Sequence, residues 1–126
     1  MDFNDTSEEA AFRAEARAWL EANAERMKAG ERPAGVEMRA EPGALKRAQD
    51  WQAKKADAGW ACITWPKEYG GRGATAIQSV IWNQEEARFK TPPAIFGIGQ
   101  GMLGPTIMVH GSDEQKRRYL RPMLRG

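Results

Sequence analysis

Residues 6–20 read TSEEAAFRAEARAWL, and this stretch sets the helical character of the chain. Thr6 is followed three residues later by Glu9, the spacing of a capping box, in which each side chain hydrogen-bonds the backbone N–H of the other residue at a helix start. Apolar residues then recur on a period of 3.6 residues, which predicts an amphipathic helix. Its predicted buried face comprises Phe12, Ala16, Trp19, Leu20 and Ala24. Its opposite side is expected to carry the surface ion pairs Glu9–Arg13 and Arg17–Glu21.

The middle of the chain predicts two further helices of the same kind. In the first, Gly59 is placed to end the helix in a left-handed conformation. Its predicted buried face comprises Leu45, Ala48, Trp51, Gln52 and Lys55. The second helix begins with a capping signal formed by Thr75 and Gln78, and it ends before Pro92. Its predicted buried face comprises Ile77, Val80, Ile81, Gln84 and Ala87.

The segments between these helices are expected to be irregular. Residues 28–42 are rich in charge, glycine and proline and predict a surface loop. Residues 60–65 (WACITW) are apolar and aromatic, but Pro66 follows them and cannot donate a backbone hydrogen bond. We therefore predict a buried extended segment there, rather than a central strand. Residues 67–73 (KEYGGRG) predict a tight loop.

The last third of the chain predicts weaker helices. Residues 94–109 are apolar, but they are interrupted by Gly97, Gly99, Gly101, Gly104 and Pro105. Since glycine costs about 1 kcal/mol relative to alanine inside a helix, any helix here is expected to be weak or broken. Ser112 with Gln115 caps a last short helix that should stop before Pro122. The pattern as a whole predicts an all-α fold, an up-and-down or orthogonal bundle of about four to six helices.

Composition narrows the class of protein. The chain has 126 residues, with 19 Lys and Arg against 17 Asp and Glu, so its net charge is +2. This balance is that of a soluble globular domain. The longest stretch without a charge, residues 91–109, contains too many glycines and prolines to predict a membrane span. The first residues lack the basic and apolar regions of a secretory signal, so a cytoplasmic protein is expected.

Several motifs in the sequence could indicate a binding or catalytic site, but each also has a simpler structural interpretation. Residues 99–104 (GQGMLG) match the G-x-G-x-x-G dinucleotide pattern, but no strand precedes them and Pro105 follows, so we do not expect a nucleotide loop. His110 and Cys62 are the only His and Cys, so no His/Cys metal cluster is expected. Glu85 and Glu86 point about 100° apart on a helix, which argues against a shared acid–base role and predicts that one of them faces solvent.

The basic residues of the C-terminal segment raise the possibility of nucleic-acid binding. They are Lys116, Arg117, Arg118, Arg121 and Arg125. Because the chain is nearly neutral overall and Asp113 and Glu114 precede these residues, a solvated helix face is the preferred interpretation.

Three segments, in order along the chain, resemble the N-terminal helical domain of the FAD-dependent acyl-CoA dehydrogenases. They are residues 3–20 (FNDTSEEAAFRAEARAWL), residues 59–73 (GWACITWPKEYGGRG) and residues 102–120 (MLGPTIMVHGSDEQKRRYL). The specific parts are the P-x-EYGG-x-G loop and the GSDEQK-x-x-YL segment. The resemblance covers nearly the whole chain.

This resemblance implies a function beyond what periodicity predicts. Family members have this helical domain, then a β domain, then a C-terminal helical bundle. A carboxylate of the bundle removes the α-proton of the acyl-CoA, and a hydride passes from the β-carbon to the flavin. Residues 1–126 correspond to the N-terminal domain, with the β domain and the bundle absent. We therefore expect no catalytic residue here, no FAD held by these residues alone, and no activity without the other domains.

The resemblance also implies partners and a site. The partners are acyl-CoA and the remaining dehydrogenase domains, in a homo- or hetero-oligomer, with neither nucleic acid nor a membrane involved. The implied substrate-binding positions, which line the acyl pocket, are Ile95, Phe96, Gly99 and Leu103. Glycines at 97, 99 and 101 remove side-chain volume, which favours a pocket for bulky, ring-containing or branched acyl groups. The alternative is that these glycines only allow close helix packing.

A second class of function remains open, because the chain could also be a free-standing helical interaction module or a non-catalytic remnant. A domain that other domains cover should expose an apolar patch larger than monomers usually carry. The predicted members of this patch are Trp51, Trp60, Trp65, Phe96 and Met102.

Overall fold

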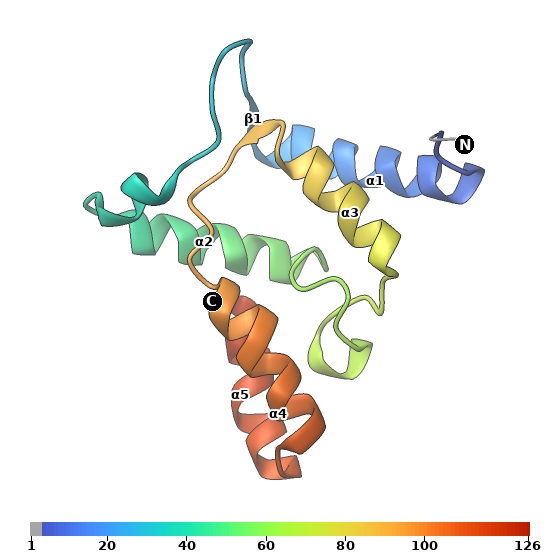
Figure 1. Ribbon diagram of the computed structural model, residues 1–126, viewed down its shortest axis with the longest axis vertical. Coiled ribbons are helices and arrows are strands. Elements are labelled where there is room, and N and C mark those ends of the chain that lie inside the picture. Colours follow the sequence, from blue (N-terminus) through green and yellow to red (C-terminus); the bar gives the residue numbers. More distant parts are fainter. Residues whose placement is uncertain (1–3) are drawn as a thin grey trace.

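The computed structural model describes residues 4–126, apart from the side chain of Val36, and it is mostly helical (Figure 1). Residues 1–3, part of the stretch from which a secretory signal was excluded, lie outside the described residues. The five α-helices are α1 (Ser7–Asn23), α2 (Ala44–Asp57), α3 (Ala76–Glu86), α4 (Gly104–His110) and α5 (Asp113–Arg125). The all-α prediction is confirmed. Within residues 4–126, no helix is long and apolar enough to cross a lipid bilayer.

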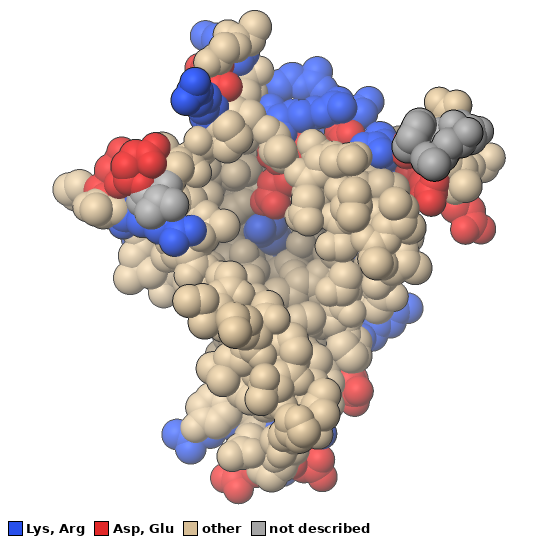
Figure 2. Space-filling view, in the orientation of Figure 1, with Lys and Arg blue, Asp and Glu red and all other residues tan. Residues whose placement is uncertain are grey.

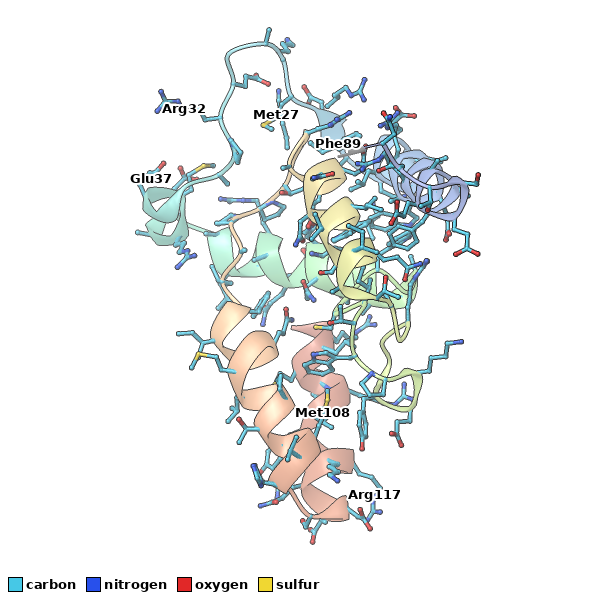
Figure 3. The ribbon with its side chains drawn as sticks, turned by 45° about the vertical axis from the view of Figure 1, so that its right-hand side comes forward. Met27, Arg32, Glu37, Phe89, Met108 and Arg117 are labelled. Carbon is cyan, nitrogen blue, oxygen red and sulfur yellow. The ribbon has the colours of Figure 1, made fainter. Side chains whose placement is uncertain are left out.

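Short elements connect these helices. Two are 3₁₀-helices, η1 (Val36–Ala40) and η2 (Lys67–Tyr69), and η3 (Gly99–Leu103) is a π-helical turn. The strands β1 (Glu25–Arg26) and β2 (Phe89–Lys90) pair antiparallel, which the sequence did not predict. This pairing holds the end of α1 beside the end of α3. Figure 3 shows Phe89 at this junction, where its side chain is buried.

The predicted helix starts are confirmed as capping boxes. Thr6 N donates to Glu9 Oε2 at 2.7 Å, and Glu9 N donates to Thr6 Oγ1 at 3.2 Å. The same reciprocal pairs form between Thr75 and Gln78 at α3, and between Ser112 and Gln115 at α5. These side chains satisfy backbone donors that a helix start leaves without an intrahelical partner.

The core consists of two clusters of buried side chains. The first core lies between α1, α3 and the segment after α2: Phe12, Ala16, Leu20, Trp60, Ile63, Ile81, Trp82 and Phe89. The second core joins that segment to α5: Ala61, Trp65, Leu120 and Leu124. The α4–α5 hairpin therefore packs below the α1–α3 pair, with α2 crossing between them (Figure 1).

The segment from Trp60 to Trp65 joins the two cores. Its predicted burial is confirmed for Trp60, Ala61, Ile63 and Trp65, but the predicted extended conformation is wrong. The backbone forms turns, with Cys62 at φ 44° and with Trp65 N donating to Cys62 O at 2.8 Å. The turns are needed because residues 60 and 63 enter the first core while residues 61 and 65 enter the second.

The face of α3 that packs on α1 differs from the prediction. Ile81 is buried as predicted, but Ile77 and Val80 are 48% and 47% exposed, and Trp82 and Glu85 are buried instead. Trp82 stacks on Trp60 with ring centroids 4.6 Å apart, which fixes this face toward the core. In α2, likewise, Ala48 and Gln52 are buried as predicted, but Leu45 is 57% exposed.

Glu85 is the polar centre of the α1–α3 contact. Its side chain is fully buried, and it accepts hydrogen bonds from Arg13 Nη1 at 3.0 Å and from Arg17 Nε at 2.9 Å. The arginines of α1 therefore reach across to α3. Neither surface pair predicted within α1 forms a salt bridge, because Arg13 is held by Asp5 and Glu85, and Arg17 is held by Glu85.

The helices of the C-terminal third are more regular than predicted. Residues 97–110 form one continuous helix, in which η3 leads directly into α4. α5 continues through Pro122 to Arg125, and Leu120 and Leu124 on either side of the proline are both buried. Packing against the second core thus outweighs the local cost of the glycines and of Pro122.

Gly104 provides a test of this packing. A Cβ at residue 104 would overlap the Trp65 indole, whereas a Cβ at Gly101 would meet nothing within 4 Å. We expect Gly104→Ala to lower the free energy of unfolding by about 1–3 kcal/mol through overpacking. The matched variant Gly101→Ala should leave it unchanged or raise it by up to about 1 kcal/mol. Urea unfolding of both variants checks this, and equal midpoints would contradict it.

The buried carboxylate of Glu85 gives a prediction for how the stability of the fold depends on pH. Hydrogen bonds from Arg17, and secondarily from Arg13, hold the pKa of Glu85 below its usual value, although burial opposes the shift. The carboxylate therefore stabilises the fold above its unfolded pKa, about 4.3, and this stabilisation is lost as the pH falls through the lower folded pKa.

We expect Glu85→Gln to lower the free energy of unfolding by about 2–3 kcal/mol at pH 7 and to reduce its loss in acid. Glu15→Gln is the control, because Glu15 pairs with Arg72 at 3.0 Å on the surface and should contribute less than about 1 kcal/mol. Urea titrations between pH 3 and 7 measure both. A Glu85→Gln profile that parallels the wild type would exclude this role.

Candidate functional site

A cleft opens between α2, α3 and the start of the η3–α4 helix. It has two lobes, of about 320 Å³ and about 430 Å³. The larger lobe is walled by Trp60, Trp65 and Trp82, and the smaller by Trp51, Phe89 and Phe96. These sizes fall within the range of small-molecule sites. Figure 2 shows a hollow near the centre of the molecule, with acidic and basic atoms at its floor.

Six residues line both lobes and form the waist of the cleft, two from each of three elements: Gln52, Lys55, Asn83, Glu86, Gly97 and Gln100. Two of them are held by α5, because Gln52 Nε2 donates to Leu124 O at 2.9 Å and Gln100 Nε2 donates to Met123 O at 3.1 Å. A Cβ added at Gly97 would meet nothing within 4 Å. The waist is therefore lined mainly by polar side chains, and it is open on the side of the η3–α4 helix.

Charge at the waist comes from Lys55 and Glu86. Their side chains are 14% and 20% exposed, and Lys55 Nζ lies 3.0 Å from Glu86 Oε1. Trp51 Nε1 donates to the same oxygen at 3.1 Å. The prediction that adjacent Glu85 and Glu86 point in different directions is confirmed, since one faces α1 and the other faces α2. Glu85 is fully buried and Glu86 is 20% exposed, so neither faces solvent freely, and Glu86 is the more exposed of the two.

The structure separates the four predicted substrate-binding positions. Phe96 lines the smaller lobe. Gly99 faces α5, where an added Cβ would lie 3.7 Å from Met123 Cγ. Ile95 is half-buried and lies outside both lobes, and Leu103 is 52% exposed. Of the neighbouring glycines, Gly97 and Gly101 line the cleft.

Sequence reasoning did not assign the polar residues of the waist to a site. Lys55 was expected on the buried face of its helix, and Glu86 was considered only with Glu85. Asn83 and Gln100 were not singled out, because polar residues on an amphipathic helix usually mark its solvent face. The only feature of the sequence that indicated a cleft was the series of glycines from 97 to 101, because the missing side chains leave space opposite α3.

An exposed apolar surface runs along the outer side of the η3–α4 helix. Its members are Ile98, Met102, Leu103 and Val109, which are 77%, 67%, 52% and 73% exposed. Figure 2 shows an uncharged surface over the lower part of the molecule, where this helix lies. Met102 was predicted to belong to such a patch, but Trp60 and Trp65 are buried in the two cores, so their predicted exposure is wrong.

Other candidate chemical groups lie outside any reactive arrangement. His110 is exposed at the end of α4. Within residues 4–126, no three His, Cys, Asp or Glu side chains are grouped to hold a metal ion. Arg117 lies near the start of α5 and is exposed (Figure 3).

Residues 99–104 do not form the dinucleotide-binding loop that their G-x-G-x-x-G pattern can indicate. Such a site needs free backbone N–H groups at the first turn of a helix that follows a strand. Residues 99–104 instead lie inside a helix, where Gly104 N donates to Gly99 O. The G-x-G-x-x-G match is therefore part of a packed helix, not a nucleotide loop.

Comparison with known proteins identifies the family. The family described as "Acyl-CoA dehydrogenase, N-terminal domain" matches residues 6–126. The chain belongs to the acyl-CoA dehydrogenase family. It is 36% identical over 114 residues to acyl-CoA dehydrogenase IpdE1 of Mycobacterium tuberculosis, covering 90% of this chain and 29% of that protein.

Solved structures of similar proteins share the fold. The ChsE4–ChsE5 complex from Mycobacterium tuberculosis superimposes with a TM-score of 0.70 and 26% identity, covering 99% of this chain and 29% of that one. The Tcur3481–Tcur3483 steroid ACAD gives a TM-score of 0.67 and 27% identity, covering 99% of this chain and 30% of that one. The chain therefore spans less than a third of the length of these similar proteins.

Cys62, on the wall of the larger lobe, gives a prediction about reactivity. Burial raises the pKa of its thiol to about 11, although Lys55 opposes the shift. At pH 8 the thiolate, which is the reactive form, should be about 100-fold scarcer than for a free cysteine. We expect iodoacetamide to label the native chain at least that much more slowly than the urea-unfolded chain. Rates within a few-fold of each other would contradict the prediction.

Proposed function

We propose that these residues form one wall of the acyl-binding pocket in an FAD-dependent acyl-CoA dehydrogenase, which introduces a double bond between the α and β carbons of an acyl-CoA thioester. The observation that carries this proposal is the cleft beside an uncharged, glycine-rich helix, in a chain whose family match covers residues 6–126. The wall binds the acyl group and excludes water from it. The flavin and the catalytic base belong to other parts of the enzyme.

The shape of the cleft favours a bulky acyl group. Gly97 and Gly101 place no side chain in the larger lobe, and the largely buried Trp60, Trp65 and Trp82 contribute only a small part of its lining. One similar structure is a steroid ACAD, which supports a ring-containing substrate here as well. Phe96 contacts this group from the smaller lobe. We further propose that Ile95, Gly99 and Leu103 complete the pocket where the other domains meet this helix.

The exposed apolar surface of η3–α4 supports assembly with other parts of an enzyme. Four large apolar side chains lie more than half exposed along one helix, Ile98, Met102, Leu103 and Val109. Surfaces of this kind are usually covered by a partner. One similar structure is a complex of two proteins, ChsE4 and ChsE5, so we propose a homo- or hetero-oligomeric dehydrogenase. The same surface is what a free-standing interaction module would present, which is the second candidate function.

Substrate range tests the proposal. For the dehydrogenase that carries these residues, we expect higher kcat/KM with a ring-bearing acyl-CoA than with butyryl-CoA. Gly101→Leu adds a side chain where nothing lies within 4 Å of its Cβ, so it should fold normally and narrow the cleft. We expect kcat/KM for the ring-bearing substrate to fall about 10-fold or more, with butyryl-CoA little affected.

Ala18→Leu, which adds the same side chain at an exposed position of α1, should change neither value. A sharp preference of the wild type for butyryl-CoA would refute the wide pocket. Absence of acyl-CoA oxidation with every substrate would refute the dehydrogenase assignment and leave the interaction module.

A further inference from the structure

Residues 32–42 form a strap beside the smaller lobe of the cleft. The strap follows β1, contains η1 and leads into α2 (Figure 1). Its residues Pro33 and Ala34 line the smaller lobe. The linker after β2, residues 91–96, contributes five of its six residues to the lining of the same lobe. The strap and the linker therefore form two sides of one opening.

The strap is attached to the rest of the molecule more weakly than the helices are. Its backbone hydrogen bonds are local, from Met38 N to Gly35 O at 3.2 Å and from Glu41 N to Met38 O at 3.4 Å. Among the described residues, no backbone–backbone hydrogen bond joins the strap to α1, to α3 or to the linker. None of its described side chains is buried. Segments with so few buried contacts open at a free energy well below that of global unfolding.

A single hydrogen bond joins the middle of the strap to the linker. Arg39 Nη2 donates to Ala94 O at 2.8 Å. The ends of the strap are held separately, because Glu31, just before it, pairs with Lys90 at 3.2 Å, and Glu41 pairs with an arginine of α2 at 3.2 Å. Loss of the bond from Arg39 would therefore free the part of the strap that lies beside the lobe and leave both ends in place.

The two sides of the opening differ in stiffness. The linker contains Pro92 and Pro93, whose rings fix φ, and Pro93 is buried. The strap ends at Gly43, where φ is 77°, and glycine has the greatest backbone freedom of any residue. Arg32 and Glu37 of the strap are exposed at the outer edge of the molecule (Figure 3). Movement is therefore expected in the strap and not in the linker.

We propose that the strap is a lid over the smaller lobe, and that the hydrogen bond from Arg39 to Ala94 O is the latch that holds the lid shut. Opening lets solutes reach the lobe from the side of the strap, without a change in the packing of either core. This inference goes beyond the proposed function, because it concerns a movement of this chain and holds whatever ligand enters the lobe.

Hydrogen exchange of the chain tests the latch. Arg39→Ala removes the donor, so we expect the amides of Met38 and Glu41 to exchange about fivefold faster after correction for intrinsic rates, the effect of roughly one exposed hydrogen bond. Exchange in α1 and α3 and the urea midpoint should not change. Arg32→Ala is the matched control, because the Arg32 side chain makes no hydrogen bond or ion pair with the described residues. It should leave exchange in the strap unaltered.

Cysteine labelling measures access to the lobe separately. Ala48 is 4% exposed and lines the smaller lobe together with the strap. In a Cys62→Ser background, iodoacetamide should label Ala48→Cys about fivefold faster when Arg39→Ala is also present, because the lid is then open more of the time. The addition of Arg32→Ala should leave the labelling rate unchanged.

Three results would overturn the proposal. Equal exchange and equal labelling in Arg39→Ala and Arg32→Ala would show that the bond to Ala94 does not hold the strap. Faster exchange throughout α1 and α3, with a lower urea midpoint, would show that the strap belongs to the global fold and is not a lid. Faster exchange in the strap without faster labelling of folded Ala48→Cys would show that the strap moves but does not cover the lobe.

Discussion

The arrangement of the molecule depends on how residues 60–65 are shared between two cores. Trp60 and Ile63 pack with α1 and α3, while Ala61 and Trp65 pack with α5. One short segment therefore fixes the distance between the α1–α3 pair and the α4–α5 hairpin. The cleft lies in the space that this distance leaves between α3 and the η3–α4 helix. Gly104 is part of the same constraint, because a side chain there would push the helix away from Trp65.

Two adjacent glutamates on α3 serve different parts of the structure. Glu85 is enclosed by Arg13 and Arg17 and joins α3 to α1. Glu86 turns toward α2, where Lys55 and Trp51 hold one of its oxygens and the other stays open. Both glutamates therefore join α3 to a neighbouring helix, Glu85 to α1 and Glu86 to α2. The rotation of about 100° between neighbouring helix positions separates the two roles.

Sequence alone predicted where helices begin but not always which side they bury. The capping boxes were correct because they depend on residues three apart. The buried face of α3 was missed because Glu85 is polar and its arginine partners lie some 70 residues away in the chain. Of the predicted site, Phe96 does line the cleft, but Lys55 and Glu86 could be found only after folding placed α2 beside α3. The helix through Pro122 likewise depends on tertiary burial of Leu124.

The π-helical turn at η3 affects how the residues that line the cleft can change during evolution. A π-helical turn is equivalent to one extra residue inserted into an α-helix. Loss of a single residue between Gly99 and Leu103 would restore regular winding and rotate the preceding turn by about 100° relative to α4. Different side chains would then face the cleft, while α4 kept its contact with Trp65. One insertion or deletion can thus exchange the lining of this wall in a single evolutionary step.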